Sequence, residues 1–555
     1  MRLSQVNCHW DPIRRRAMWL SRLLNTAWML SCRRDRTAFL EASHQVRRTQ
    51  VSLLNETLNS NRDCRFGRQY DFASIQNIDQ FRERVPLADY SSFEPDIKDI
   101  CAGKSGLLTS ECVRLLEPTS GTTSGRRLIP YTRLLRQQFQ RSVNAWIADL
   151  FCHRPAVRQG RAYWSVTPAI ESEKTSGGLR IGFEDDTEYL HPFARRVASK
   201  LLAVSSNEMQ RVRQEDFFFE TLRRLIHVRD LSLISVWSPT FLVSMARGLE
   251  VHSHQVERTL RSAGHSRELL DIVSSNGPLP DKLRAIWPQL AVISCWADGS
   301  AANHIPQLQT LFPGIEIQPK GLVSTEAFVS FPLVDHEGSA LAIQSHFFEF
   351  QPVDGTEATT RLAHELIEGQ QYKVIVTTGG GLYRYQTQDV VTIVGFINES
   401  PLIRFCGRAD QTTDLVGEKL GHIFVEEAVR DALTELNMRN APALLVPDAK
   451  RPGYRLFVGC SQTLIAASEI RDAVEKRLSA NPYYKHAIQV GQLIPLSATI
   501  VERQWELIQA YEDQLVSFGV RRGDIKPAIL VCIQHADRVL TRLIRFSGYA
   551  KNWVP

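Results

Sequence analysis

A loop rich in hydroxyl groups and glycines is the strongest chemical feature of this sequence. Residues 117–130 read Glu-Pro-Thr-Ser-Gly-Thr-Thr-Ser-Gly-Arg-Arg-Leu-Ile-Pro. Backbone N–H groups and hydroxyls in such a loop can surround a phosphate with hydrogen-bond donors. The lysine-ended P-loop pattern is absent, because Arg126 stands where that pattern has its second glycine. The segment therefore predicts either a Ser/Thr/Gly type of phosphate loop or a solvated turn cluster.

Two further segments place a carboxylate beside a turn. In Gly321–Glu326 a hydroxyl and a carboxylate, Thr325 and Glu326, follow an expected strand at 314–318. A carboxylate near triphosphate oxygens can hold Mg²⁺, which prefers oxygen ligands. In Thr378–Asp389 we expect Asp389 at a turn before a strand, where it can accept hydrogen bonds from ribose hydroxyls. The alternative for each is an ordinary polar turn.

A change in amino-acid composition after Arg404 predicts a boundary between two domains. Residues 406–421 are polar and punctuated by glycines, which is typical of a hinge. Beyond them we expect helices near 423–437, 466–478 and 501–518 and strands near 443–459 and 528–534. Lys526 precedes the last expected strand and could project an ammonium group from this small domain, although a single lysine is a surface residue by default.

The elements before the boundary alternate between helix and strand. Helical spacing covers residues 11–60 and 131–150, and polar helical periodicity covers 241–274. Short β-branched runs at 226–241 and 290–296 predict buried strands, and further strands are expected at 341–350, 372–378 and 390–396. We therefore predict an α/β protein with a large multi-sheet N-terminal domain, residues 1–405, and a smaller mobile α+β domain, residues 406–555.

Composition excludes several classes of protein. The 555 residues exceed one ordinary core, and 43% hydrophobic and 23% charged residues fit a globular protein. The net charge of +6 does not require a nucleic acid partner. Ten scattered cysteines without a C-x-x-C pair predict reduced thiols in a cytoplasmic protein. The apolar stretch at 18–30 carries polar residues and predicts an amphipathic helix rather than a membrane span or signal peptide.

In their order and spacing, these motifs resemble one family. The series 119–130, 324–326, 383–389 and 407–408 looks like the three nucleotide motifs and the hinge of the adenylate-forming, firefly-luciferase-like superfamily. More specifically, the chain resembles bacterial-type members of the Gretchen Hagen 3 (auxin-responsive promoter) family of acyl-acid amido synthetases over about residues 40–535. The longer runs that support this narrower resemblance are 61–70, 81–90, 162–190, 236–241, 294–298, 320–326, 382–389 and 407–420.

The resemblance implies a ligase that uses ATP and Mg²⁺. A carboxylic acid would be adenylated, and the acyl group would pass to an amine, typically of an amino acid. Thr325 would bond the α-phosphate, Glu326 would hold Mg²⁺, and Lys526 would neutralise charge, so these three would be the catalytic residues. The other nucleotide contacts that the resemblance implies are Ser120, Gly121, Thr122 and Thr123 on phosphate, Asp389 on ribose, and Arg408 at the hinge. Rotation about 408–410 would re-form the site for the amine.

The chain departs from the family pattern in each motif. Arg127 replaces the usual lysine of the first motif, and the second lacks its leading Tyr-Gly. In the third, Gln386 and Gln388 stand for Arg and Gly, so a turn that needs positive φ would be strained at Gln388. His422 stands where Glu is expected. The alternatives are therefore a coenzyme A ligase with the same first step, or a degenerate nucleotide-binding protein. The motifs leave the acid, the amine and the oligomeric state open.

Overall fold

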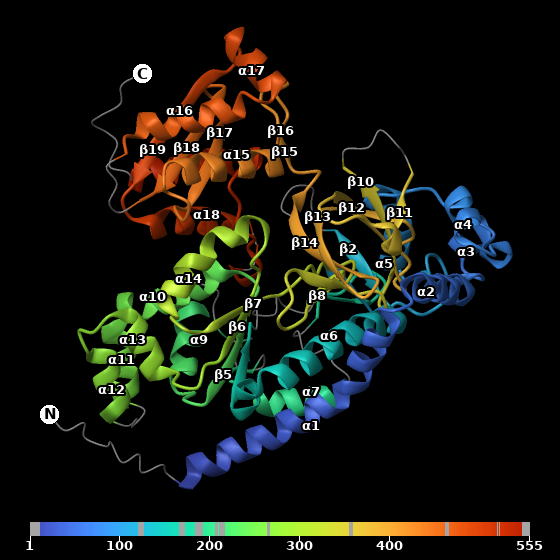
Figure 1. Ribbon diagram of the computed structural model, residues 1–555, viewed down its shortest axis with the longest axis horizontal. Coiled ribbons are helices and arrows are strands. Elements are labelled where there is room, and N and C mark those ends of the chain that lie inside the picture. Colours follow the sequence, from blue (N-terminus) through green and yellow to red (C-terminus); the bar gives the residue numbers. More distant parts are fainter. Residues whose placement is uncertain are drawn as a thin grey trace.

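The computed structural model describes residues 12–119, 127–165, 173–183, 192–205, 209, 212, 217–262, 267–353, 359–460, 465–518, 520 and 522–546. They form a broad N-terminal part with several sheets and a smaller C-terminal part above it (Figure 1). The first two helices, α1 (Pro12–Ala42) and α2 (Val46–Asn61), confirm the helical prediction for this region. None of the helices in the described ranges combines the length and apolar character needed to cross a membrane.

A four-stranded parallel sheet forms the centre of the N-terminal part. Its strands, in spatial order, are β3 (Arg161–Trp164), β5 (Leu231–Ser235), β6 (Val292–Cys295) and β7 (Glu316–Pro319). Strands β5 and β6 are buried on both faces, and their residues are apolar or small. Leu233 and Val292 belong to one hydrophobic core, whereas Ile234 and Ile293 belong to another. Successive side chains therefore point to opposite faces of this sheet.

Helices cover the two faces separately (Figure 1). On the face of Leu233 lie α1, α6 (Arg133–His153) and α7 (Pro192–Leu201). On the face of Ile234 lie α9 (Phe217–Ile226), α10 (Pro239–Val251), α11 (Ser253–Ser262), α12 (Arg267–Ser274), α13 (Leu279–Ile286) and α14 (Ile305–Leu311). The layers leave the carboxyl ends of the strands free to carry polar residues, as in other open α/β sheets.

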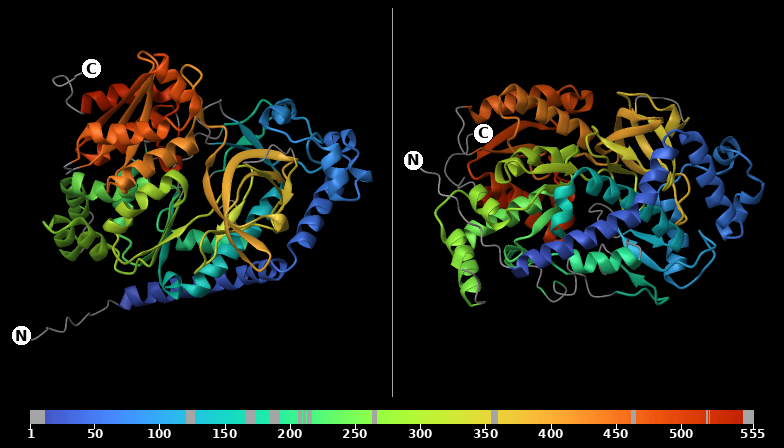
Figure 2. Two further views of the ribbon diagram at one scale, coloured as in Figure 1. Left: turned by 45° about the horizontal axis from the view of Figure 1, so that its top comes forward. Right: turned by 60° about the horizontal axis from the view of Figure 1, so that its bottom comes forward.

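A seven-stranded antiparallel sheet curves beside this layer (Figure 2). Its order is β11 (Arg361–Leu362), β10 (Phe347–Pro352), β12 (Gln371–Thr377), β13 (Tyr385–Ile397), β14 (Ser400–Arg408), β9 (Ser339–Leu341) and β8 (Ser330–Pro332). The strand expected at 341–350 is thus two strands, β9 and β10, on different sides of the sheet. Near it lie α3 (Arg65–Gln69), α4 (Ile78–Arg84) and α5 (Tyr90–Cys101). A third sheet holds β1 (Leu115–Pro118), β2 (Leu128–Tyr131) and β4 (Arg180–Ile181).

The C-terminal part has its own sheet and cores. Strands β17 (Ala443–Asp448), β18 (Gly453–Gly459) and β19 (Ile494–Val501) pack between α15 (His422–Glu435), α16 (Ala467–Leu478) and α17 (Pro482–Gln489) on one face and α18 (Gln504–Ser517) and α19 (Ile533–Phe546) on the other. A short ribbon, β15 (Thr412–Thr413) and β16 (Leu420–Gly421), precedes them. The architecture is the predicted α/β class with a multi-sheet N-terminal part.

One expected strand in the C-terminal part is wrong. Residues 528–534 contribute only an isolated bridge between Leu530 and Leu445, and α19 begins at Ile533. Helical spacing decides the outcome, because Ala536, Val539 and Leu543 recur on one buried face. A short apolar run does not by itself distinguish a strand from the start of a buried helix.

A buried histidine beside β10 makes the stability of the fold depend on pH. His346 is fully buried, and its Nε2 accepts a hydrogen bond of 3.1 Å from the backbone N–H of Phe328. Burial, with a smaller contribution from Arg141, lowers the pKa of His346 from 6.5 to about 3. Between these two values the unfolded chain binds a proton that the folded chain does not, so the stabilisation is complete above pH 6.5 and is lost as pH falls toward 3.

We therefore expect His346→Gln to weaken the acid dependence of stability. The variant lacks the proton uptake on unfolding, so its unfolding midpoint in urea should fall less than that of the wild type between pH 6.5 and pH 4.5, a window below the ordinary pKa of histidine. The matched control is His486→Gln, which changes an exposed histidine and should retain the wild-type slope. Identical slopes for the wild type and His346→Gln would contradict the assignment.

Candidate functional site

The loop after β7 presents Thr325 and Glu326. Gly321 opens it with φ +75°, and a Cβ atom at this position would lie 2.5 Å from the carbonyl oxygen of Ser330. Only glycine fits such a close approach. The loop is held from the other side by Tyr131, whose hydroxyl donates to the backbone oxygen of Thr325 at 3.0 Å. Strand β2, which follows the hydroxyl-rich loop, thereby fixes the position of the second motif.

Asp389 and Arg408 lie opposite each other on β13 and β14. Arg408 Nη1 is 3.5 Å from Asp389 Oδ1, and the guanidinium also pairs with Asp410 at 2.8 and 2.9 Å. Asp389 is only 2% exposed. Burial raises the pKa of this carboxyl, Arg408 and Lys526 lower it, and Glu326 raises it. The pair thus forms a buried acceptor next to a guanidinium at the end of the large sheet.

Lys526 reaches the same place from the C-terminal part. Its ammonium lies 5.9 Å from the centroid of the Trp296 ring, and it is close enough to Asp389 to influence the pKa of that carboxyl. Trp296 directly follows β6 in the N-terminal part. The structure therefore brings together four predicted site residues, Glu326, Asp389, Arg408 and Lys526, of which Asp389 and Arg408 lie on paired neighbouring strands and the other two on distant segments.

The proposed phosphate loop itself lies outside the described residues. Ser120, Gly121, Thr122 and Thr123 all fall in that segment. Its two ends are held together, because β1 and β2 pair in antiparallel register and the N–H of Thr119 donates to the oxygen of Arg127 at 2.9 Å. Arg127 lies 5.4 Å from the ring of Tyr90, and its charge opposes part of the increase in the pKa of Tyr385 that burial causes. The base of this loop therefore lies near Tyr385.

Tyr385 has a role that the sequence analysis did not assign. Its hydroxyl lies 3.4 Å from Glu326 Oε1, and its side chain is 2% exposed. Burial, followed by the nearby Glu326, raises the pKa of Tyr385. A protonated hydroxyl here orients one oxygen of Glu326 and leaves the second for another partner. Tyr385 belongs to the third motif, but the motif alone does not indicate that it contacts the second.

The prediction that Asp389 lies at a turn is wrong. Strand β13 runs from Tyr385 to Ile397, so Asp389 lies inside it. The irregularity is at Gln388, which has φ +66°, and the β13–β14 register shifts just beyond, between Val390 and Val391. Gln388 therefore holds a side chain at a backbone conformation that favours glycine, and the strain predicted from the sequence at this position is present.

We expect Gln388→Gly to stabilise the protein by about 0.5–1 kcal/mol. A left-handed conformation costs a non-glycine residue about 1–2 kcal/mol, and the added flexibility of the unfolded chain offsets part of the gain. The check is the midpoint of urea unfolding. Gln386→Gly is the matched control, because Gln386 lies in the same strand without a positive φ and should be destabilised by glycine. A lower urea midpoint than the wild type in both variants would contradict the proposed backbone strain at Gln388.

Glu418, within the expected hinge segment 406–421, and His422, just after it, have structural roles. Glu418 is fully buried, accepts hydrogen bonds from the N–H groups of Leu415 and Val416 at 2.7 and 2.8 Å, and pairs with the hydroxyl of Tyr454. His422 begins α15, and burial lowers its pKa to about 4. Its ring nitrogen lies 3.8 Å from Glu426 on the same helix. Histidine in place of the expected glutamate at position 422 therefore changes the surroundings of α15 and not the Asp389–Arg408 pair.

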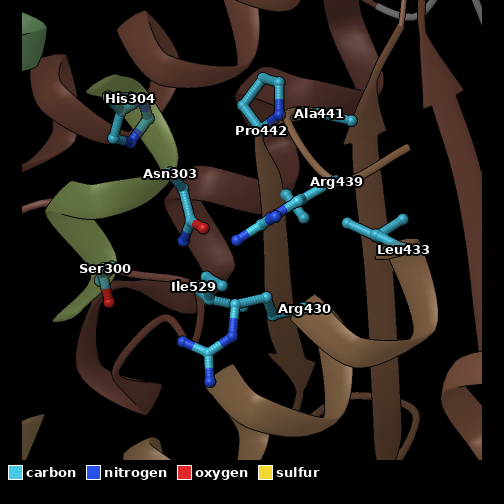
Figure 3. A pocket seen from close by; sticks show the side chains of 11 residues that line it. Ser300, Asn303, His304, Arg430, Leu433, Arg439, Ala441, Pro442 and Ile529 are labelled. Atoms are coloured by element: carbon cyan, nitrogen blue, oxygen red, sulfur yellow. The ribbon is translucent and has the colours of Figure 1, made fainter. Parts of the chain in front are cut away.

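The C-terminal part contacts the N-terminal part through η4 (Gly299–His304). Ser300 donates to Glu426 Oε2 of α15 at 2.6 Å, and burial raises the pKa of Glu426. A small cavity borders this contact, and Figure 3 shows Asn303 of η4 and Arg439 of the C-terminal part on opposite sides of it.

The donor set fits a nucleotide with a hard cation. Glu326 supplies a carboxylate oxygen that Mg²⁺ prefers, Asp389 supplies a buried acceptor for hydroxyl groups, and Arg408 and Lys526 supply positive charge. Within the described ranges, there is no cluster of three or more His, Cys, Asp and Glu residues that could hold a metal by itself. A single carboxylate suits Mg²⁺ that is bound mainly through phosphate oxygens.

Comparisons with known proteins agree with this arrangement. The GH3 family N-terminal domain matches residues 35–317, and the GH3 family central domain matches residues 339–408. A rice protein, "Putative indole-3-acetic acid-amido synthetase GH3.10", is 24% identical over 71% of this chain and 85% of its own length. "Indole-3-acetic acid-amido synthetase GH3.8" from Oryza sativa subsp. indica is 22% identical over 87% of each chain.

A solved structure has the same fold. The structure of "AtGH3.15 acyl acid amido synthetase in complex with 2,4-DB" superposes with a TM-score of 0.77, covering 91% of this chain and 95% of the other at 19% identity. The first match covers strands β3, β5 and β6 of the parallel sheet and ends within β7, and the second covers the large sheet from β9 to Arg408. The chain belongs to the GH3 family, the Gretchen Hagen 3 family of the sequence analysis.

Proposed function

We propose that this protein is an ATP-dependent acyl-acid amido synthetase. The observation that carries the proposal is the meeting of Glu326, Asp389, Arg408 and Lys526 at the junction of the two parts of the chain. A cation-binding carboxylate, a buried acceptor and two positive groups are what an adenylation site needs. The related proteins are named amido synthetases, which supports transfer of the acyl group to an amine.

The first step would form an acyl-adenylate. A carboxylate oxygen of the acid attacks the α-phosphorus of ATP, a new P–O bond forms, and the bond to pyrophosphate breaks. Negative charge develops on phosphate oxygens, so fixed positive charges and donors stabilise the transition state more than the ground state. Lys526 supplies such a charge, and Thr325 would donate to the α-phosphate.

The remaining residues would hold the nucleotide. Asp389 would accept hydrogen bonds from the ribose hydroxyls, and Arg408 would contact ribose or phosphate. Glu326, oriented by Tyr385, would hold Mg²⁺, which neutralises phosphate charge when bound. The donors to the β- and γ-phosphates would be Ser120, Gly121, Thr122 and Thr123.

The second step would form the amide. The amine nitrogen attacks the acyl carbon, the bond from that carbon to the AMP oxygen breaks, and the amine loses a proton. We propose that residues 1–405 and 406–555 are two domains and that the second rotates about 408–410 between the steps. The hydrophobic cores beyond this hinge use residues from Leu415 onward, which supports a C-terminal unit that moves as one body.

The substrates would be a small carboxylic acid and an amino acid or another amine, and the compartment would be the cytoplasm. The nine cysteines that the structure describes are free thiols, which fits a reducing environment. Neither nucleic acid nor a membrane is needed for this chemistry.

The experiment that tests the acceptor compares amino acids with coenzyme A. The protein is incubated with ATP, Mg²⁺ and acids that support adenylation, and products are identified by mass spectrometry. An N-acyl amino acid is the expected product. An acyl-thioester of coenzyme A would instead assign a ligase of the coenzyme A type, and nucleotide binding without any pyrophosphate would assign a degenerate nucleotide-binding protein.

A further inference from the structure

Four side chains form a row across the carboxyl end of the parallel sheet. The Cα register pairs Trp164 with Ser235, Ser235 with Ser294, and Ser294 with Gln318. Leu233, two residues before Ser235, belongs to the core that contains α6. Because side chains two residues apart share a face of a strand, the whole row faces α6. Polar groups thus lie on a sheet face that is otherwise apolar.

Two polar atoms of this row are buried without a hydrogen-bond partner in the described part of the chain. They are the Ser294 hydroxyl oxygen, in a residue that is 0% exposed, and the indole nitrogen of Trp164, in a residue that is 9% exposed. A buried donor or acceptor without a partner destabilises the folded protein. Two such atoms at the carboxyl end of one sheet indicate a place where a polar ligand completes the hydrogen bonds.

Lys320 places an ammonium group at the same end of the sheet. Its Nζ donates to Ser235 Oγ at 2.6 Å and lies 4.7 Å from the Trp237 ring centroid and 5.5 Å from that of Trp146. Trp146, on α6, is itself fixed by a hydrogen bond of 2.9 Å from its indole nitrogen to Gln318 Oε1. Lys320 and Trp237 are half-buried, and the ammonium lies between two indole rings. An acceptor on a bound ligand would be attracted to this group.

A pair of indole rings connects Lys320 with Lys526. The Trp237 and Trp296 centroids are 5.7 Å apart with an interplanar angle of 40°. Lys320 lies beside Trp237, and Lys526 lies 5.9 Å from Trp296. A flat apolar group lying along this pair would have one end at each ammonium. The Lys526 end is the proposed adenylation site, so it takes the reacting carboxylate.

We propose that Lys320 selects the acyl acid by binding an acceptor oxygen at its far end. The substrate class is then a carboxylic acid with a flat apolar middle and a second oxygen, best a carboxylate, remote from the reacting one. The ammonium and the Ser294 and Trp164 groups would receive that oxygen, and Trp237 and Trp296 would contact the middle. This inference rests on the proposed function, because it takes the Lys526 end as the place of adenylation.

The test uses two acids that differ only at the far end: 3-(4-carboxyphenyl)propanoate and 3-(4-methylphenyl)propanoate. Binding is followed by tryptophan fluorescence, and turnover by ATP–pyrophosphate exchange. The wild type should favour the carboxylated acid by about 10–100-fold, the usual size of a charged hydrogen bond. Lys320→Met keeps the apolar stem and should abolish the preference through KM, with kcat nearly unchanged. Lys320→Arg keeps the charge and should retain part of the preference.

Lys476→Met is the matched control, because Lys476 is exposed on α16 and its loss should leave the preference intact. Thermal unfolding of each variant verifies folding. Equal responses of the wild type to both acids, including no response to either, would overturn the inference, as would a preference that survives in Lys320→Met. Binding of the carboxylated acid that depends on Lys320, without ATP–pyrophosphate exchange, would support the acid site and contradict the proposed function. Exchange at equal rates with both acids would support the proposed function and contradict the role of Lys320.

Discussion

Lys526→Ala is expected to slow ATP–pyrophosphate exchange by about 10²-fold or more, the loss typical for removal of one preorganised donor to a transition state. Lys526 is exposed and contacts the site across the junction between the two parts of the chain. Its loss should therefore leave the unfolding temperature and the affinity for ATP nearly unchanged. The measurement is exchange at saturating acid and ATP. Lys476→Ala, another exposed lysine of the C-terminal part, should match the wild type.

The same variant distinguishes the two steps. If the C-terminal domain rotates after adenylation, Lys526 leaves the site before the amine attacks. Lys526→Ala should then convert a chemically prepared acyl-adenylate into the amide at nearly the wild-type rate. An equal decrease in the rates of both half-reactions of Lys526→Ala would contradict the rotation. An unchanged rate of ATP–pyrophosphate exchange would contradict the role of the lysine itself.

Arg384→Ala is expected to reduce the free energy of unfolding by about 3–5 kcal/mol, because it leaves a buried carboxylate without its main partner. The guanidinium makes two hydrogen bonds to Glu349, at 2.9 and 3.0 Å, and two to the backbone oxygens of Arg82 and Val85. Glu349 is fully buried and also accepts from Arg82 and Thr360. This network fixes the residue that precedes β13, so exchange activity should fall with stability.

The control for Arg384 is a surface pair. Arg404 pairs with Glu337, and both side chains are largely exposed, so Arg404→Ala should cost less than about 1 kcal/mol. A double variant, Arg384→Met with Glu349→Leu, removes both charges and should be less destabilised than the sum of the single changes. Urea unfolding measures all of these. A loss in Arg384→Ala no larger than that in Arg404→Ala would contradict the account of the network.

Local patterns predicted the long helices and strands β5, β6 and β7 of the parallel sheet, but not strand β3 or the short helices α3, α4 and α5. The apolar run at 290–296 became β6 because a strand buried on both faces is mostly apolar, and the strand expected at 314–318, in which Ile alternates with polar residues, became β7. The same reasoning failed at 528–534, where a few apolar residues are compatible with either a strand or the first turn of a helix. It also placed Asp389 in a turn, since the sequence does not show that a strand continues through the strained Gln388.

The site residues depended on long-range contacts that spacing cannot reveal. Glu326 and Asp389 were identifiable as carboxylates beside motifs, but their shared partners come from other elements: Tyr385 contacts Glu326, and Lys526 acts on Asp389 from the far end of the chain. A single lysine has no local signal, so only the resemblance to a family indicated Lys526. The sequence does not indicate a role for Lys320, because its neighbours Ser235 and Trp237 belong to another strand and to the loop after that strand.

The most direct test of the central claim is acid-dependent ATP–pyrophosphate exchange by the wild-type protein. Labelled pyrophosphate is supplied with ATP, Mg²⁺ and one acid at a time from a panel of aromatic, aliphatic and jasmonate-like acids. The account predicts that label enters ATP only when a suitable acid is present, since the acyl-adenylate forms and reverts at the site of Glu326, Asp389 and Lys526. No exchange with any acid, by protein that still binds ATP, would contradict it and would assign a nucleotide-binding protein without ligase activity.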